Sequence, residues 1–307
     1  MLTTLTIMSS NVVKSWKGVF GFPVTPLKKD LSVDLDGLRK NVDWMTQNPF
    51  CAFVCAGGTG ELYSLTAEEV GDITAASVEA AHGRMGVVAG TGFNVPIGVD
   101  MAKRAEKAGA QALLILPPYY QNPPEEGLFH FYESIAGATS LPVLIYSREW
   151  ASFSPRQVAE LAKRIPNLQG WKDGQGDARK FQRIMHAVGD RLAWFGGIGD
   201  DCVPGYFAVG VQAYTSSISN IAPQLSLMLA EAGMKRDFGK LSELMNKYVH
   251  PLYAIRDRLR GYEVSVMKEA MEILGMPAGP VRPPLVNTRP QDIDDVRALM
   301  KVYEDVL

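Results

Sequence analysis

Short apolar segments alternate with longer amphipathic stretches between residues 18 and 217, and this alternation constrains the fold more than any other feature of the chain. Each short segment is apolar almost throughout, as strands of a parallel sheet are when helices cover both of their faces. The stretches between them carry apolar residues three and four positions apart, which is the spacing of a helix with one buried face. The predicted strands cover residues 19–22, 52–54, 87–89, 112–116, 143–146, 168–172, 193–195 and 213–216.

Successive strand–helix units of this kind favour a closed (β/α)8 TIM barrel, with an open doubly wound sheet as the alternative. Residues typical of helix ends support the division. Ser154 followed by Pro155 indicates an N-cap and a first helical turn, and Asp177 indicates the N-cap of the next helix. Gly109 stands where a helix is expected to stop.

Beyond Asn220 the pattern changes, because helical stretches follow one another with no strand between them. The predicted helices cover residues 222–232, 238–260, 263–274 and 290–306. We therefore predict two parts, a (β/α)8 barrel over residues 18–219 and a C-terminal helical extension over residues 220–307.

Composition narrows the classes of function. Among the 307 residues, 31 lysines and arginines nearly balance 33 aspartates and glutamates, and the net charge is −2. This balance favours neither nucleic acid nor a membrane surface as a partner. No apolar run reaches the roughly 18 residues that a spanning helix needs. Three cysteines are too few for a disulfide framework, and the first 18 residues lack the features of a signal peptide, so we expect a cytoplasmic protein.

Two reactive side chains stand at the carboxyl ends of neighbouring predicted strands, where barrel enzymes hold their active sites. Strand 168–172 ends at Lys172, and burial would lower the pKa of its amine and leave it free to attack a carbonyl. Strand 143–146 ends at Tyr146, whose phenol could move a proton. The structural alternatives for Lys172 are a side chain that extends to the surface or a buried ion pair with Asp173. The structural alternative for Tyr146 is an aromatic side chain that merely covers the barrel.

Other strand ends offer polar groups or space. The glycine-rich turn after the second strand places the amides of Gly58 and Thr59 where they could bind an anion. Gly196 would leave room for a substrate, Ser216 lies in a hydroxyl-rich segment, and Tyr120 is expected in the pocket or at a subunit contact. The four histidines are scattered along predicted helices, so we predict no metal site.

Several motifs together resemble the dihydrodipicolinate synthase / N-acetylneuraminate lyase superfamily. They are GFPVTP near the start, GGTGELYSLT after the second strand, PPYY after the fourth, Tyr146 on the fifth and GWKDGQGD on the sixth. The resemblance implies a (β/α)8 barrel with a C-terminal helical extension, usually assembled as a homotetramer, with a dimer as the alternative. It also implies a Schiff base between Lys172 and a small-molecule 2-oxo acid, without a metal or an organic cofactor.

Within the superfamily the chain departs from the synthases and lyases at three positions. Gly58 replaces a hydroxyl residue, Ala151 replaces an arginine, and Asp173 replaces a glutamate. The chain is more similar to the 5-dehydro-4-deoxyglucarate dehydratases, which share the GGTGE turn, the KDG-x-GD segment and a late AGPVR-x-PL run. It differs from that branch at Ser147 and Glu149, and its PYY segment is closer to the aldolases.

The resemblance assigns a role to each predicted site residue. Lys172 would form the imine and Tyr146 would relay protons, while Gly58 and Thr59 would hold the adjacent carboxylate. Arg148 would pair with the far carboxylate of the substrate or form a structural salt bridge. The expected reaction is the dehydration and decarboxylation of 5-dehydro-4-deoxyglucarate to 2,5-dioxopentanoate. The alternatives are a class I aldolase or lyase that releases or condenses pyruvate, and a non-catalytic barrel that only binds an oxo acid.

Overall fold

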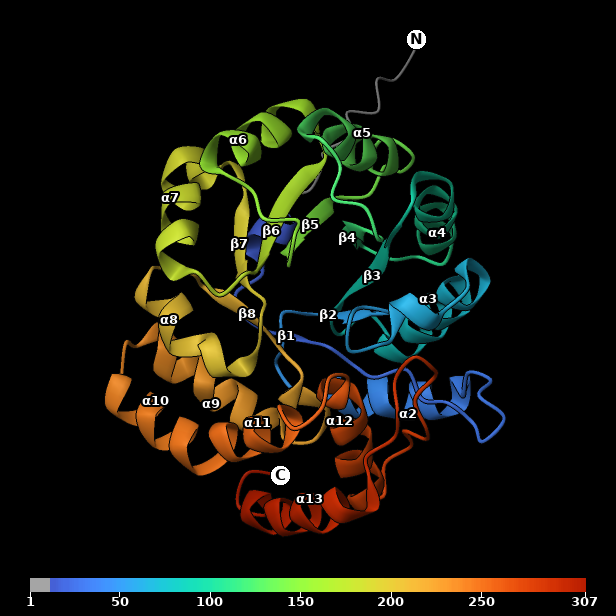
Figure 1. The fold of residues 1–307 in the computed structure, drawn as a ribbon, viewed down its shortest axis with the longest axis vertical. Coiled ribbons are helices and arrows are strands. Elements are labelled where there is room, and N and C mark those ends of the chain that lie inside the picture. Colours follow the sequence, from blue (N-terminus) through green and yellow to red (C-terminus); the bar gives the residue numbers. More distant parts are fainter. Residues whose placement is uncertain (1–11) are drawn as a thin grey trace.

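Parallel strands close into a barrel with helices outside them (Figure 1). The structure is a computed structural model that describes residues 12–307. Strand β1 pairs in parallel with both β2 and β8, so the sheet has no free edge. The predicted (β/α)8 barrel is confirmed, and the alternative of an open sheet is wrong. The strands are β1 (Gly18–Gly21), β2 (Ala52–Cys55), β3 (Gly86–Phe93), β4 (Ala112–Pro118), β5 (Val143–Arg148), β6 (Leu168–Gly174), β7 (Ala193–Gly196) and β8 (Ala213–Ser216).

All of the predicted strands are present, and several continue further than the sequence predicts. The clearest case is the pair β5 and β6, where the ladder runs on through Ser147↔Asp173 and Arg148↔Gly174. Hydrophobicity ends at about Tyr146 on β5, whereas the backbone hydrogen bonds continue into polar residues. Lys172 is therefore not the last residue of β6, and two further residues of the strand follow it.

The ring of helices includes one that the sequence assigns to the extension. Helix α9 packs against β1, β8 and α8, which is the position of the last helix of the barrel. We therefore propose that the extension begins near residue 235 rather than at residue 220. The predicted N-caps Ser154 and Asp177 are confirmed. The helices of the ring are α2 (Leu35–Met45), α3 (Ala67–Ala81), α4 (Val95–Lys107), α5 (Glu125–Ala136), α6 (Pro155–Arg164), α7 (Ala178–Val188), α8 (Val203–Ala208) and α9 (Pro223–Met234).

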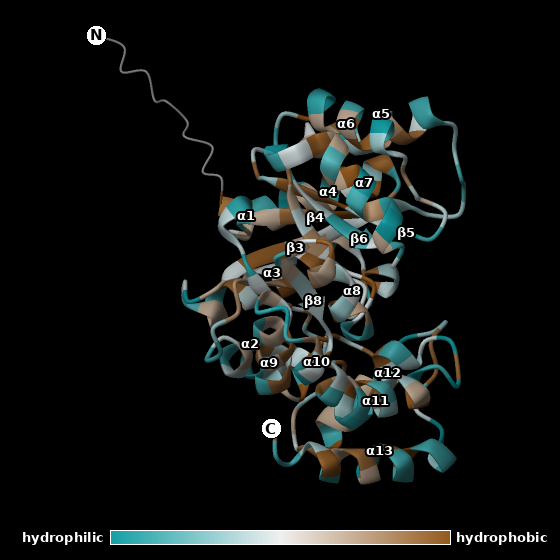
Figure 2. Ribbon diagram, turned by 90° about the vertical axis from the view of Figure 1, so that its left-hand side faces the viewer, coloured by the Kyte–Doolittle hydropathy of each residue, from teal (hydrophilic) through white to brown (hydrophobic). Residues whose placement is uncertain are grey.

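The remaining helices gather on one side of the barrel, next to β8, β1 and β2 (Figures 1 and 2). The stretch 238–260, predicted as one helix, contains a π-helical turn over Met245–Val249 between α10 and α11. Pro251 follows this turn and lacks the amide that a regular α-helix would use there, which accounts for the irregularity. The helices are α10 (Phe238–Leu244), α11 (His250–Arg256), α12 (Tyr262–Ile273) and α13 (Pro290–Tyr303).

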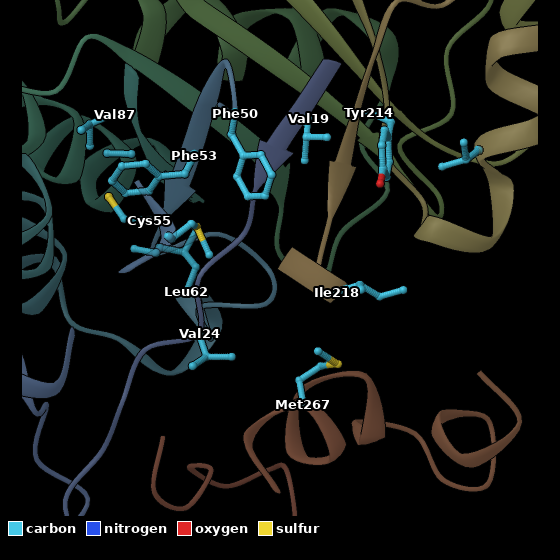
Figure 3. Close-up of a cluster of buried hydrophobic side chains, with 14 of the residues drawn as sticks. Val19, Val24, Phe50, Phe53, Cys55, Leu62, Val87, Tyr214, Ile218 and Met267 are labelled. Carbon is cyan, nitrogen blue, oxygen red and sulfur yellow. The ribbon is translucent and has the colours of Figure 1, made fainter. Parts of the chain in front are cut away.

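Two hydrophobic cores hold these layers together. The inner core fills the barrel with Phe20, Leu144 and Phe195, and Trp16, just after α1 (Val12–Ser15), closes its amino-terminal end against Phe20. The outer core lies between the strands and the helices. Figure 3 shows part of it, with Met267 projecting from α12 towards barrel residues. The extension is therefore continuous with the outer core and is not a separate unit joined by a linker.

Across residues 12–307, no helix has both the length and the apolar character required to cross a membrane. Much of the segment on which the signal-peptide prediction rests, residues 1–11, lies outside the described residues.

Gly90 on β3 offers a test of the packing beneath the glycine-rich turn. A methyl group at this position would collide with the carbonyl oxygen of Ala56. Because backbone must move to relieve the collision, Gly90→Ala is expected to lower the free energy of unfolding by about 2–3 kcal/mol. Urea denaturation followed by circular dichroism measures the change. Gly205→Ala is the matched control, since Gly205 is exposed in α8 with no atom within 4 Å of an added methyl group. Equal stability of the two variants would contradict this packing.

Candidate active site

The amine of Lys172 lies inside the carboxyl end of the barrel. Alternation along β6 turns Trp171 and Asp173 outward and Lys172 inward, and the lysine is 4% exposed. Its Nζ donates a hydrogen bond of 2.6 Å to the carbonyl oxygen of Gly197, just after β7. The ring of Phe22 lies 5.2 Å from Nζ and forms an apolar wall beside it. The amine is thus held in a fixed direction in largely apolar surroundings.

Tyr146 lies directly beside this amine. The two residues are register partners on β5 and β6, and Nζ of Lys172 lies 3.4 Å from the centre of the Tyr146 ring. The phenol donates a hydrogen bond of 3.2 Å to the carbonyl oxygen of Gly197, which also accepts from Lys172. One carbonyl therefore positions both groups, as the predicted pairing of Lys172 with Tyr146 requires.

Burial sets the protonation of both groups. Desolvation lowers the pKa of Lys172 well below its usual value, the positive charge of Arg148 lowers it further, and the carboxylate of Asp173 opposes these effects. Desolvation also raises the pKa of Tyr146 to about 12. At neutral pH the phenol keeps its proton, while the amine loses its own more readily than an exposed lysine does. An amine that deprotonates readily and a phenol that keeps its proton thus stand side by side, the pair that nucleophilic attack and proton transfer require.

Asp173 does not form the ion pair with Lys172 that was the structural alternative. Its side chain points out of the barrel, where its Oδ2 accepts hydrogen bonds from the Tyr206 hydroxyl at 2.9 Å and the Gly176 amide at 3.1 Å. Desolvation raises the pKa of Asp173. The carboxylate nearest to the lysine in sequence is therefore directed away from it and held by other partners.

Arg148 lies at the end of β5 with its side chain 39% exposed. Its guanidinium donates to the carbonyl oxygen of Gly174 at 3.2 Å and lies 3.9 Å from the carboxylate of Glu149. The contact with Glu149 is too long for a strong hydrogen bond. Arg148 is therefore partly exposed next to the site, where an anionic substrate could reach its guanidinium.

The glycine-rich turn forms another part of the site. Phe22 packs against Gly57, so the turn shares an apolar wall with Lys172. Gly58 and Thr59 are half-buried, and a methyl group on Gly58 would meet no atom within 4 Å. Within the described residues neither amide donates a hydrogen bond to another group of the chain. Two consecutive amides without a partner in the chain, next to open space at Gly58, suit an anion such as a carboxylate.

Gly196 does not provide the space for a substrate that the sequence predicts, whereas Gly197 lies beside Lys172. Gly196 points outward, and a methyl group there would collide with the ring of Tyr206, so this glycine makes room for a helix of the ring and not for a substrate. A methyl group on Gly197 would lie 2.7 Å from Nζ of Lys172. We therefore withdraw Gly196 from the site and place Gly197 in it. Strand parity could have identified Gly197, because Phe195 faces inward.

Ser216 also faces away from the site. It is fully buried, and its hydroxyl donates to Asp200 and lies 2.8 Å from the hydroxyl of Ser226 on α9. The prediction that Ser216 contacts the substrate is corrected, since its hydroxyl forms hydrogen bonds with Asp200 and Ser226 outside the barrel. On β8 the neighbouring Thr215 has the opposite direction, which the alternation of a strand requires.

Tyr120 does not line the pocket of its own chain. It is 80% exposed, and its ring lies beside that of Tyr119, with the ring centres 6.2 Å apart. The other expectation for Tyr120, a subunit contact, stays a prediction. Among the described residues no cluster of three or more histidine, cysteine, aspartate or glutamate side chains could hold a metal ion.

The closed parallel barrel, with a buried lysine and a tyrosine at its carboxyl end, places the chain among the (β/α)8 barrel proteins that build their sites at that end. Residues 15–303 match the model of the Dihydrodipicolinate synthetase family. The chain belongs to this family.

Several relatives that are about 40% identical to this chain share one name. A protein of Bradyrhizobium diazoefficiens is 40% identical over 286 residues, covering 92% of this chain and 91% of its own, and is named "Probable 5-dehydro-4-deoxyglucarate dehydratase". A protein of Xanthomonas campestris with the same name is 39% identical over 88% of this chain and 89% of its own. The crystal structure of dihydrodipicolinate synthase from Oceanobacillus iheyensis has a TM-score of 0.90 at 29% identity, covering 96% of this chain and all of that one.

Replacing Arg148 tests whether its positive charge lowers the pKa of the Lys172 amine. The guanidinium disfavours a second positive charge on Lys172, so Arg148→Met is expected to raise the pKa of Lys172, and the protonated amine should persist to higher pH. NMR titration of ¹³C-lysine-labelled protein follows this change at the Cε carbon. Arg156→Met, which removes an exposed arginine paired with Glu125, is the control and should leave the titration in place. An unchanged or lowered pKa in Arg148→Met would exclude this electrostatic role.

Proposed function

We propose that the protein is a Schiff-base lyase that dehydrates and decarboxylates 5-dehydro-4-deoxyglucarate to 2,5-dioxopentanoate. The observation that carries this proposal is the buried amine of Lys172 beside the Tyr146 phenol. Both groups donate hydrogen bonds to the carbonyl oxygen of Gly197. The name shared by relatives such as the one from B. diazoefficiens supports the choice of substrate. In this proposal no step needs a metal ion or an organic cofactor.

Binding would place the 2-oxo carboxylate of the substrate on the free amides of Gly58 and Thr59. The 2-oxo carbon then lies within reach of Lys172, whose uncharged amine attacks it. The resulting carbinolamine loses its hydroxyl as water, with the proton supplied through Tyr146, and a protonated imine remains. A phenol with a pKa of about 12 suits this step, because it carries its proton at neutral pH.

Dehydration follows from the imine, which withdraws electrons from the adjacent methylene carbon. Loss of a proton from that carbon gives an enamine. The electron pair of the enamine expels the hydroxyl group on the next carbon as water, and a conjugated imine remains. Because the imine acts as the electron sink, the protein does not have to stabilise a free carbanion.

Decarboxylation uses the same electron sink a second time. The bond to the far carboxylate breaks, carbon dioxide leaves, and its electron pair moves through the conjugated system to the imine nitrogen. Protonation and hydrolysis then release 2,5-dioxopentanoate and restore Lys172. Arg148 would guide the far carboxylate, and its half-exposed position suits a weak contact. A tight clamp would stabilise charge that the transition state is losing.

Product analysis tests the reaction. Purified protein incubated with 5-dehydro-4-deoxyglucarate is expected to release carbon dioxide and 2,5-dioxopentanoate in equal amounts. Release of pyruvate instead would establish the aldolase or lyase alternative. Borohydride added during turnover should reduce the imine and attach the substrate skeleton to Lys172, as mass spectrometry would show. Lys172→Met is the control that should remain unlabelled. If the wild-type lysine also stays unlabelled, the Schiff base is excluded.

Tyr146→Phe tests the proton relay separately from binding. The variant removes only the hydroxyl, so the ring beside Lys172 remains and KM should change little. We expect kcat to fall about 10²- to 10⁴-fold, the usual contribution of a positioned acid or base. Steady-state kinetics on 5-dehydro-4-deoxyglucarate measures both constants. Ser147→Ala on the same strand is the control, since the Ser147 hydroxyl donates to the Ala151 carbonyl outside the barrel. A Tyr146→Phe variant with wild-type kcat would refute the assignment.

The proposal also includes the oligomeric state of the protein and its cellular compartment, and both rest on the sequence. The family resemblance favours a homotetramer, with a dimer as the alternative, and the low cysteine content favours the cytoplasm. Both stay predictions.

A further inference from the structure

A glutamate that ends the glycine-rich turn is held by the C-terminal extension. Glu61 follows Gly60 directly, and its carboxylate lies 2.5 Å from Nζ of Lys268 on α12. The side chains of Glu61 and Lys268 are only 1% and 2% exposed. The other carboxylate oxygen of Glu61 accepts from the backbone amide of Arg282 at 2.9 Å. Two parts of the extension therefore hold the same carboxylate.

A buried ion pair contributes little net free energy to the packing of a helix on a barrel. Removing two charges from water costs more than packing two apolar side chains, and apolar replacements of buried ion pairs are often equally stable. An ion pair does fix the direction and distance of its two partners, which apolar packing does not. Lys268 is fixed further by a hydrogen bond of 2.8 Å to the carbonyl oxygen of Pro280. This geometry points to a positioning role.

The turn itself needs to be held. Ala56 and Glu61, at its two ends, have φ angles of 48° and 57°, which residues other than glycine rarely adopt. Thr25 holds the residue next to Glu61, since its hydroxyl donates a hydrogen bond of 2.7 Å to the carbonyl oxygen of Gly60. Glu61 fixes the end nearest to the extension. Gly58 and Thr59 directly precede these anchored residues, and within the described residues their amides donate no hydrogen bond to another group of the chain.

We propose that Lys268 is a positioning residue, which through its ion pair with Glu61 holds the glycine-rich turn in the shape that binds the substrate carboxylate. The proposal rests on the proposed function of Gly58 and Thr59. Lys268 does not touch the substrate. It acts on Glu61, and Glu61 fixes the backbone that carries the two amides.

A cavity beside Lys268 makes the test specific. It has a volume of about 540 Å³, lies between α12 and residues 27–29, and is lined by Lys268 and Pro280 among others. In Lys268→Ala, n-propylamine can enter through this cavity and replace the missing part of the side chain. Lys268→Met fills the same space with an uncharged chain and leaves no room for the amine.

We expect KM for 5-dehydro-4-deoxyglucarate to rise about 10- to 100-fold in both Lys268 variants, the usual effect of a binding group displaced by about 1 Å. The value of kcat should change much less, because Lys172 and Tyr146 are untouched. Millimolar n-propylamine should restore KM in Lys268→Ala and have no effect in Lys268→Met. Lys247→Met, which removes an exposed pair with Asp305, is the control with wild-type constants.

Hydrogen exchange measured by mass spectrometry tests the same proposal without a substrate. Amides of residues 56–61 should exchange faster in both Lys268 variants than in the wild type or in Lys247→Met. A purely structural role would lower the melting temperature but leave KM and this exchange unchanged, and that result would overturn the proposal. If borohydride fails to label Lys172 in the wild type, the proposed function fails, and exchange of the turn alone then decides the role of Lys268.

Discussion

The loss of water around one amine is the constraint on which the rest of the site depends. A lysine that stays hydrated stays charged, and a charged amine does not attack a carbonyl. The barrel removes this water by closing a parallel sheet around Lys172 and by placing Phe22 beside it. Gly197 completes the arrangement, because any larger residue would occupy the space of the lysine side chain. Fold and reactivity are therefore joined at one position.

The alternation of a strand separates the charges that would otherwise cancel this effect. Asp173 follows Lys172 directly, and a carboxylate beside the amine would favour its protonated form. The strand turns the two side chains to opposite faces. Outside the barrel, Tyr206 and Gly176 donate hydrogen bonds to the Asp173 carboxylate. On the inner side the nearby charge is that of Arg148, which has the opposite effect on the amine. The site is thus electrostatically asymmetric across a single strand.

The sequence predicts the barrel well because most of the buried strands are nearly continuous apolar runs, and it singles out Lys172 and Tyr146 because a polar residue ends such a run. It fails where the direction of a side chain decides the outcome. Gly196 and Ser216 stand at strand ends as predicted, but parity turns both of them outward. The sequence also gives no means of choosing between the barrel and the extension for α9, since helical periodicity does not tell which partner a helix packs against. The pairing of Glu61 with Lys268 leaves no local signal, because the two residues are far apart in the chain.

That separation has a consequence for the order in which the protein matures. The turn over residues 56–61 leaves the ribosome early, whereas the amide that binds Glu61 belongs to Arg282, 221 positions later. Because the partners of Glu61 are Lys268 and Arg282, this turn acquires them only after residue 282 has been synthesised. A nascent chain that has completed β8 still lacks the two groups that hold the Glu61 carboxylate. The turn over residues 56–61 therefore reaches its final structure only once α12 and the segment that follows it have been made.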